Sequence, residues 1–153
     1  MNIRKPTTAD LSAIKLILAD TELFPPDMLE ELIEPFLQGN EQRDRGLVCE
    51  TLPDGVVGFS YTRFEELADS VWNLLAIGFR ADQQGSGFGT QLIEEVERSL
   101  TGERLLIIET SSLDNFNNTR NFYQSRGYVQ EAVIRDYWAD GEDKIIFKKR
   151  LGS

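Results

Sequence analysis

The chain has 153 residues, of which 41% are hydrophobic and 27% charged, and these values suit one soluble globular domain spanning residues 1–153. It has no histidine and a single cysteine, Cys49, which excludes an internal disulfide, Ser-His-Asp or Cys-His catalysis and the ordinary zinc sites. The net charge of −10 argues against a nucleic-acid-binding surface, and it suits either a cationic substrate such as an amine or solubility alone.

The first half of the chain predicts two helices and a hairpin. Apolar residues recur at helical spacing in two segments, and glycine, proline and asparagine mark helix ends. Pro53-Asp54-Gly55 is a tight-turn sequence between two strand-like segments, so these strands should pair as a hairpin. The expected elements are a helix over about 9–20, a second helix from Pro25-Pro26 to Gly39-Asn40, and strands at Gly46–Leu52 and Val56–Phe64.

The second half alternates strands and helices. Its first strand, helix and second strand form a βαβ unit, which should be right-handed, and the apolar run Leu105–Ile108 indicates a strand buried on both faces. The fold class is therefore α/β (α+β), a mixed sheet of about seven strands flanked by about four helices. The expected elements are a strand at 71–79, a helix at about 87–100, a strand at 104–110, a helix at about 115–126, and strands near 128–134 and 143–150 joined across Ala139-Asp140-Gly141.

A glycine-rich turn, Gln84-Gly85-Ser86-Gly87-Phe88-Gly89-Thr90, precedes the helix of the βαβ unit. Glycines expose backbone N–H groups, and a helix start has free donors and a positive dipole end, so this turn predicts a phosphate site. The alternative is a turn that only packs the helix on the sheet, although each glycine costs roughly 1 kcal/mol relative to alanine in a helix interior. The segment lacks the Lys-Ser/Thr of a P-loop. It matches the dinucleotide-binding fingerprint G-x-G-x-x-G only in part, although Glu109 stands at the position of the acid that binds the ribose in that motif.

Two motifs carry a family resemblance. Gln84–Gly89 matches Gln/Arg-x-x-Gly-x-Gly/Ala without a gap, and Phe122–Tyr128 matches a later F-Y-x-x-x-G-F/Y segment. In these motifs, and in the order of its elements over essentially the whole chain, the sequence resembles the GNAT family of N-acetyltransferases. The resemblance implies an acyltransferase that takes acetyl-CoA as its acyl donor and needs no metal.

The resemblance also places the donor. The pyrophosphate of CoA is expected on the turn amides from Gly85 to Thr90, with Gln84 at the first motif position. The family's sheet is splayed between the strands at 71–79 and 104–110, and the free edge pairs with the pantetheine arm as an added strand would. The positions that make those contacts fall on Ile77, Gly78 and Phe79. This chain departs from the family's A-V-x-P there, because Gly78 is followed by Phe79-Arg80-Ala81.

Two residues are implied to do the chemistry. Tyr123 matches the family's general acid, and a phenol with a reference pKa near 10 is protonated at neutral pH and can protonate the leaving thiolate. The alternative for Tyr123 is a buried aromatic residue of the core. Apart from the resemblance, the amine must lose a proton before it attacks, and the absence of histidine leaves a carboxylate, a water chain or bulk solvent as the base. Glu109, at the end of its strand, would act through water or else hydrogen-bond the splayed strands, and Asp136 and Asp140 are second choices as the base. The asparagine often found seven residues before the tyrosine is replaced by Phe116.

The acceptor side is less defined. The aromatic and acidic stretch Arg135–Lys144 would shape a pocket for a cation, with Asp136 and Trp138 as substrate-binding residues, or it is a solvated hairpin tip. The acidic composition leans towards a small-molecule amine, while antibiotics, amino acids and protein N-termini stay open. We expect no membrane partner, because no apolar run approaches roughly 20 residues. A cytoplasmic location is expected, and a homodimer is compatible with the sequence.

Three functions are therefore weighed. The leading one is an acetyl-CoA-dependent N-acetyltransferase that acts by direct attack in a ternary complex, since no Cys or Ser nucleophile has a base nearby. The second is a non-catalytic acyl-CoA sensor on the same fold. The third is a nucleotide-binding oxidoreductase with Glu109 on a ribose.

Overall fold

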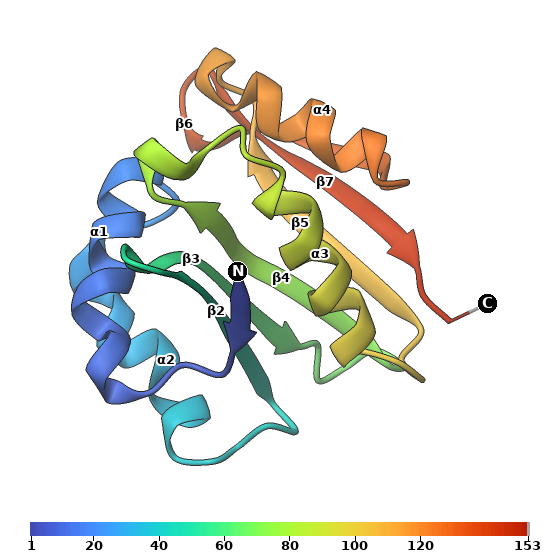
Figure 1. The fold of residues 1–153 in the computed structure, drawn as a ribbon. Helices are drawn as coiled ribbons and strands as arrows, with labels where there is room; N and C mark the ends of the chain where they lie inside the picture. Colours follow the sequence, from blue (N-terminus) through green and yellow to red (C-terminus); the bar gives the residue numbers. More distant parts are fainter. Residues whose placement is uncertain (153) are drawn as a thin grey trace. The chain divides into compact units, whose positions relative to one another are not determined.

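A computed structural model describes residues 1–152, and its strands are hydrogen-bonded in the order β1-β2-β3-β4-β5-β7-β6 in a mixed sheet (Figure 1). None of the described helices is long and apolar enough to cross a membrane. The helices are α1 (Leu11–Thr21), α2 (Leu29–Leu37), α3 (Phe88–Ser99) and α4 (Asn117–Ser125). The strands are β1 (Asn2–Arg4), β2 (Asp44–Thr51), β3 (Gly55–Phe64), β4 (Val71–Phe79), β5 (Leu105–Ser111), β6 (Val129–Ala139) and β7 (Glu142–Arg150).

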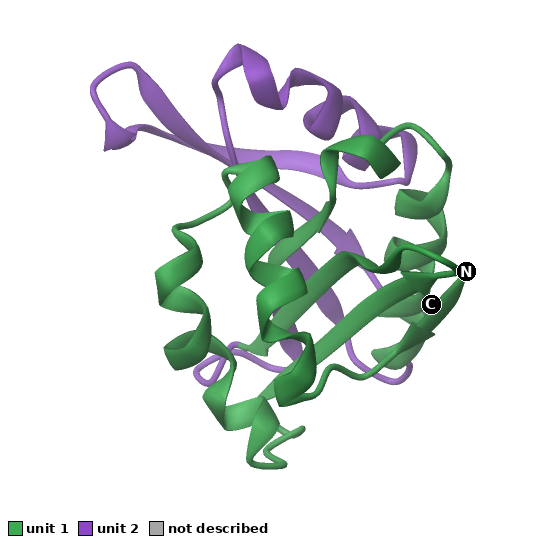
Figure 2. Ribbon diagram, turned by 60° about the vertical axis from the view of Figure 1, so that its left-hand side comes forward, with its two compact units in different colours: residues 1–64, 75–100 green, residues 65–74, 101–153 purple. Residues whose placement is uncertain are grey.

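The chain divides into two compact units (Figure 2). The beginning of β4, up to Leu74, belongs to the second unit, and the rest of β4, from Leu75, belongs to the first. The first unit consists of Met1–Phe64 and Leu75–Leu100, and it holds β1, β2, β3, the end of β4, and α1 to α3. Side chains alternate across its strands, so that Val48 and Phe59 pack with α1 and α2 while Cys49 and Val57 pack with Leu92 of α3. This alternation gives the first unit a core on each face of its strands.

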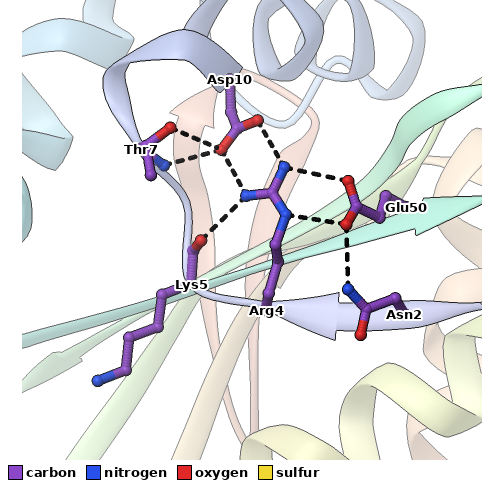
Figure 3. A network of polar contacts seen from close by, with 6 residues as sticks. All are labelled: Asn2, Arg4, Lys5, Thr7, Asp10 and Glu50. Carbon is purple, nitrogen blue, oxygen red and sulfur yellow. Dashed lines mark hydrogen bonds and ion pairs between the residues drawn. The ribbon is translucent and has the colours of Figure 1, made fainter.

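A polar network fixes the start of the first unit (Figure 3). The Arg4 guanidinium donates to both carboxylate oxygens of Asp10 at 2.8 and 2.9 Å, and its Nε lies 3.1 Å from Oε1 of Glu50. Asn2 also donates to Glu50, which is its register partner on β2. The Asp10 carboxylate accepts from the Thr7 backbone N–H as well. The network therefore ties β1 to β2 and to the short 3₁₀ turn that leads into α1.

The second unit consists of Glu65–Leu74 and the described residues from Thr101 onward. The first residues of β4 run parallel to β5 in the register Val71–Leu74 to Leu105–Ile108. On its other side β5 is antiparallel to β7, and β7 pairs with β6 in a long hairpin. The unit is thus built on β4, β5, β7 and β6, with α4 as its helix.

The structure confirms every predicted helix and strand to within a few residues at its ends, and it corrects two details. Only Leu106 and Ile108 are fully buried in the apolar run of β5, whereas Leu105 and Ile107 keep some exposure. The prediction of burial on both faces was therefore wrong. The strand expected to end near 134 continues to Ala139, because a bulge with Asp136 at φ 55° lets the pairing resume at Ala139 and Glu142.

Candidate functional site

The glycine-rich turn lies in the first unit and joins the end of β4 to α3. Gly85 and Gly87 have φ values of 80° and 84°, a region that side-chain-bearing residues rarely adopt, and Gly87 is the N-cap of α3. A Cβ atom added at either glycine would meet no heavy atom within 4 Å. These two glycines therefore do not pack the helix on the sheet, and the open space beside them is compatible with a ligand on the backbone.

The start of α3 offers free donors. No side chain caps this helix, and Gln84 to Gly87 are exposed. The turn's own polar side chains bond elsewhere, since Ser86 Oγ donates to the Gln83 carbonyl at 2.7 Å and Gln84 Nε2 donates to the Phe79 carbonyl at 3.0 Å. A helix start with uncapped N–H groups and a positive dipole end is suited to phosphate oxygens. The residues from Gly85 to Thr90 thus fit the pyrophosphate of a CoA molecule.

The end of β4 is held by its side chains, and its parallel pairing with β5 covers only Val71–Leu74. The Phe79 ring packs over Gly58, where an added Cβ would come within 2.4 Å of it, and lies 6.1 Å from the Phe88 ring at the start of α3. Gly78 is close to α1, because a Cβ there would lie 2.9 Å from Thr21 Cγ2. Ile77 is half-buried against the same core as Phe79. Any contact of these residues with a pantetheine arm would therefore be through the main chain.

Tyr123 lies in the second unit, on the sheet-facing side of α4. It is 3% exposed, and its ring centroid lies 5.8 Å from that of Phe147 and 6.1 Å from that of Tyr128. Burial raises the pKa of the Tyr123 phenol, because the phenolate would lose its hydration. Tyr123 is thus both a packed aromatic residue and a phenol that stays protonated at neutral pH.

Glu109 lies on β5 and is bound from two sides. Its Oε1 is 2.8 Å from the Lys144 ammonium on β7, and its Oε2 accepts from Asn73 Nδ2 on β4 at 3.3 Å. The same Asn73 amide nitrogen donates to Glu65 Oε1 at 3.3 Å. The Glu109 side chain keeps 29% of its exposure, so it remains reachable while it is paired. Glu109 does hydrogen-bond across the sheet, which is one of its two predicted roles.

Two partners of Glu109 were not singled out from the sequence: Asn73, and Lys144, which was named only as the end of the stretch Arg135–Lys144. Asn73 is the polar residue inside the apolar run of β4, and its pairing with Ile107 puts it on the same face as Glu109. Glu109 pairs with Ile146, which puts Lys144 on that face too. The interruption of an apolar strand by an asparagine was the available signal. The lysine could be found only once the strand register was known.

Asp136 and Trp138 lie on the bulged part of β6. The Asp136 carboxylate accepts the Gly141 N–H at 2.8 Å, and the Asp136 N–H donates to Asp143 Oδ1 at 3.0 Å. Trp138 is 47% exposed and stands edge-on to Tyr137 at 5.2 Å. The cation that these rings face is Lys144, 4.0 Å from the Tyr137 centroid and 5.9 Å from that of Trp138. Asp136 therefore shapes the hairpin, and Tyr137 is the closer aromatic contact.

Comparisons with known proteins indicate the family of the fold. A family model described as an acetyltransferase (GNAT) domain matches residues 42–130. A search of curated protein sequences found no match. Among the described residues there is also no group of acidic, histidine or cysteine side chains that could hold a metal ion.

Solved structures match over nearly the full chain. A GNAT-family protein from Desulfovibrio desulfuricans is 26% identical with a TM-score of 0.88, over 97% of this chain and 98% of that one. The ribosomal-protein-S18-alanine N-acetyltransferase of Escherichia coli is 21% identical with a TM-score of 0.78, over 99% and 94%. The spermidine N-acetyltransferase of Vibrio cholerae, in complex with CoA and spermine, is 16% identical with a TM-score of 0.80, over 98% and 95%.

Proposed function

Because the chain belongs to the acetyltransferase (GNAT) family and is an acyltransferase that uses an acyl-CoA, we propose that it transfers an acetyl group from acetyl-CoA to an amine. The observation that carries this proposal is the exposed, uncapped turn before α3. We further propose that residues 1–153 form a single N-acetyltransferase domain.

The donor is held by backbone groups in this proposal. The turn amides of Gly85 to Thr90 bind the pyrophosphate, and the end of the turn is steadied by the bond from Gln84 to the Phe79 carbonyl. The main chain at Ile77, Gly78 and Phe79 pairs with the pantetheine arm beyond the parallel register of β4. Positioning of the thioester then depends on main-chain geometry, which the buried Phe79 ring fixes.

The reaction is a direct attack in a ternary complex. The amine nitrogen attacks the thioester carbonyl, the carbon–nitrogen bond forms, and the carbon–sulfur bond breaks. The amine's proton passes to Glu109, directly or through water, and on to solvent. Tyr123 gives its proton to the leaving CoA thiolate, and the raised pKa of its phenol keeps that proton available at neutral pH. The proton that the nitrogen loses on becoming an amide restores the phenol through solvent.

The acceptor is a small-molecule amine in this proposal. The net charge of −10 and the half-exposed aromatic residues of β6 support a cationic group that arrives near Glu109. Trp138 would contact the acceptor directly, and Asp136 would act by holding the bulge that presents the aromatic residues. Spermidine, the substrate named for one matched bacterial enzyme, is the natural first candidate, and the ribosomal-protein alanine named for another is the protein-amine alternative.

Two measurements test the proposal. The first follows CoA thiol release and product mass with acetyl-CoA and a panel of primary amines that includes spermidine, tyramine, kanamycin and an alanine-starting peptide. Acetyl-CoA binding without turnover on any amine would point to the sensor function instead. The second is Tyr123→Phe, which should lower kcat by about a hundredfold because the thiolate loses its acid. Full turnover of this variant at every pH would remove Tyr123 from the mechanism.

A further inference from the structure

Lys144 is a cation that the second unit builds into the neighbourhood of Glu109. Its side chain is only 11% exposed, and its ammonium lies between the Glu109 carboxylate at 2.8 Å and the Tyr137 ring at 4.0 Å. Burial lowers the pKa of Lys144, but the hydrogen bonds and charges of Glu109 and of the Tyr137 hydroxyl together outweigh burial, so that the net pKa is raised. Lys144 is therefore a permanent positive charge at neutral pH.

Packing and stability alone do not account for the placement of Lys144 between Glu109 and Tyr137. An ion pair that keeps partial exposure, as Glu109 does at 29%, adds little net stability, so stability alone does not explain a lysine here. The Tyr137 ring reaches Lys144 because β6 bulges at Asp136, whose left-handed backbone is held by bonds to Asp143 and Gly141. The chain thus uses a sparsely populated backbone conformation to enclose this ammonium.

Besides Glu109, this face carries Glu65, Glu142 and Lys148, and Lys148 is paired with Glu131 at the surface. Lys144 also interacts with the Tyr137 hydroxyl. Glu65 is linked to Glu109 through Asn73 and comes from the segment before β4. Glu142 of β7 accepts a hydrogen bond from Ser111 Oγ at 2.7 Å. Neither glutamate is ion-paired with Lys144 among the described residues. The charge that Lys144 compensates is therefore that of Glu109.

We propose that Lys144 is a positioning residue that neutralises Glu109, so that the acceptor amine next to it gives up its proton. This inference rests on the proposed function, in which Glu109 passes the amine's proton on to solvent and is ionised again when the amine attacks. A bare carboxylate would hold the incoming amine as the ammonium, which binds well but cannot attack. A carboxylate that is paired with Lys144 through Oε1 and accepts from Asn73 through Oε2 stabilises the ammonium form of an acceptor much less.

The inference predicts that KM and kcat both fall when the charge of Lys144 is removed. In Lys144→Met the bare Glu109 should bind the acceptor more tightly, which lowers KM about threefold to tenfold. The acceptor should then stay protonated to a higher pH. We therefore expect kcat at pH 7 to fall about tenfold and the half-maximal activity to move up by about one pH unit. Lys144→Arg keeps the charge and should keep the pH profile. If Lys144 were needed only for packing, Lys144→Met would raise KM or leave it unchanged, and the pH profile would not move.

Lys148→Met is the matched control on the same strand. Lys148 is 43% exposed and lies 3.3 Å from Glu131 at the surface. Its loss should leave KM, kcat and the pH profile unchanged. The acceptor for these assays is the best substrate from the amine panel.

A binding experiment tests the inference without turnover, so that its outcome is separate from that of the proposed function. Calorimetry with propylammonium chloride on the CoA-loaded protein should give about threefold to tenfold tighter binding to Lys144→Met than to the wild type. The gain should vanish in the double variant Lys144→Met/Glu109→Gln. Equal binding to wild type and Lys144→Met, or a gain that survives in the double variant, would overturn the inference. A protein that binds CoA but acetylates no amine would count against the proposed function alone.

Discussion

Glu50 in the first unit and Glu109 in the second are bound by the same kinds of group. Glu50 lies 3.1 Å from Arg4 and accepts from Asn2 at 3.0 Å, while Glu109 lies 2.8 Å from Lys144 and accepts from Asn73 at 3.3 Å. The two carboxylates are also similarly exposed, at 33% and 29%. Neither the pairing nor the exposure of a carboxylate distinguishes a structural role from a chemical one.

The difference lies in what surrounds each pair. Arg4 is shared with Asp10, which is 7% exposed, so the first network joins β1, β2 and the start of α1 (Figure 3). Lys144 has an aromatic ring as its other neighbour, and Asn73, only 6% exposed, keeps an Oδ1 without a hydrogen-bond partner among the described residues. The first network is a closed set of bonds between elements. The second is incomplete, which is expected where a substrate takes part.

The largest expected contrast is between Glu109→Gln and Glu50→Gln. Loss of the proton acceptor should lower kcat about a hundredfold in Glu109→Gln, because a general base typically contributes at least that much. Glu50→Gln should leave kcat unchanged. Turnover with the best amine of the panel, on protein shown to be folded by circular dichroism, measures both. Equal losses in the two variants would show that the two networks do not differ in role.

For stability we expect the larger effect in the first unit, where Arg4 is replaced, and the smaller effect in the second, where Lys144 is replaced. Arg4→Met leaves the nearly buried Asp10 carboxylate without its partner and should cost about 2 kcal/mol of unfolding free energy. Lys144→Met should cost less than about 1 kcal/mol, because Glu109 remains hydrated and the methionine fills the space. Urea unfolding of both variants gives the comparison. A larger loss for Lys144→Met than for Arg4→Met would contradict it.

The loss of stability at low pH should depend on Asp10 in the network of Arg4, Asp10 and Glu50. The hydrogen bonds from Arg4 lower the pKa of Asp10 in the folded protein, against the smaller opposing effect of burial. The stability that Asp10 contributes is therefore present above its unfolded pKa of about 3.9 and is lost as the pH falls through the lower folded value. Urea midpoints between pH 6 and pH 2.5 should fall more steeply for the wild type than for Arg4→Met. Parallel curves would indicate that Asp10 is not stabilised by Arg4.

The smallest effects are expected at the two asparagines. Asn73→Ala should lower kcat only about threefold to fivefold, because Glu109 keeps Lys144 but loses one hydrogen bond that orients it. Asn2→Ala removes an exposed bond to Glu50 and should change neither kcat nor, by more than about 0.5 kcal/mol, stability. Steady-state kinetics and urea unfolding measure these changes. A kcat effect at Asn2 as large as at Asn73 would weaken the assignment of the two networks.

Local sequence patterns were enough for the elements and the donor turn. Helical spacing placed α1 to α4, and Pro53-Asp54-Gly55 placed the β2–β3 hairpin, because these signals depend on neighbouring residues only. The turn before α3 was recognisable because Gly85 and Gly87 satisfy a backbone conformation that other residues rarely adopt.

The contacts that could not be predicted from the sequence depend on how the strands are paired in the sheet. The pairs Glu109–Lys144 and Asn73–Glu109 join residues on different strands, so they follow from strand pairing and not from spacing along the chain. The bulge of β6 was also missed, because Asp136 adopts a left-handed backbone that its residue type permits but does not require. Asp136 and Trp138 were therefore chosen for their chemistry, while Tyr137 makes the closer contact.

The central claim is that the turn before α3 binds the donor, and calorimetry with acetyl-CoA tests it most directly. We compare the wild type with Gly87→Ala and with Gly55→Ala, a control at the β2–β3 turn with φ 77° and equally open space. Both variants carry the same backbone strain, but only Gly87→Ala alters the phosphate-binding turn. We predict micromolar binding to the wild type and to Gly55→Ala, and binding to Gly87→Ala weaker by about tenfold. Absence of binding to the wild type at high micromolar acetyl-CoA, or equal affinities for all three proteins, would contradict the claim.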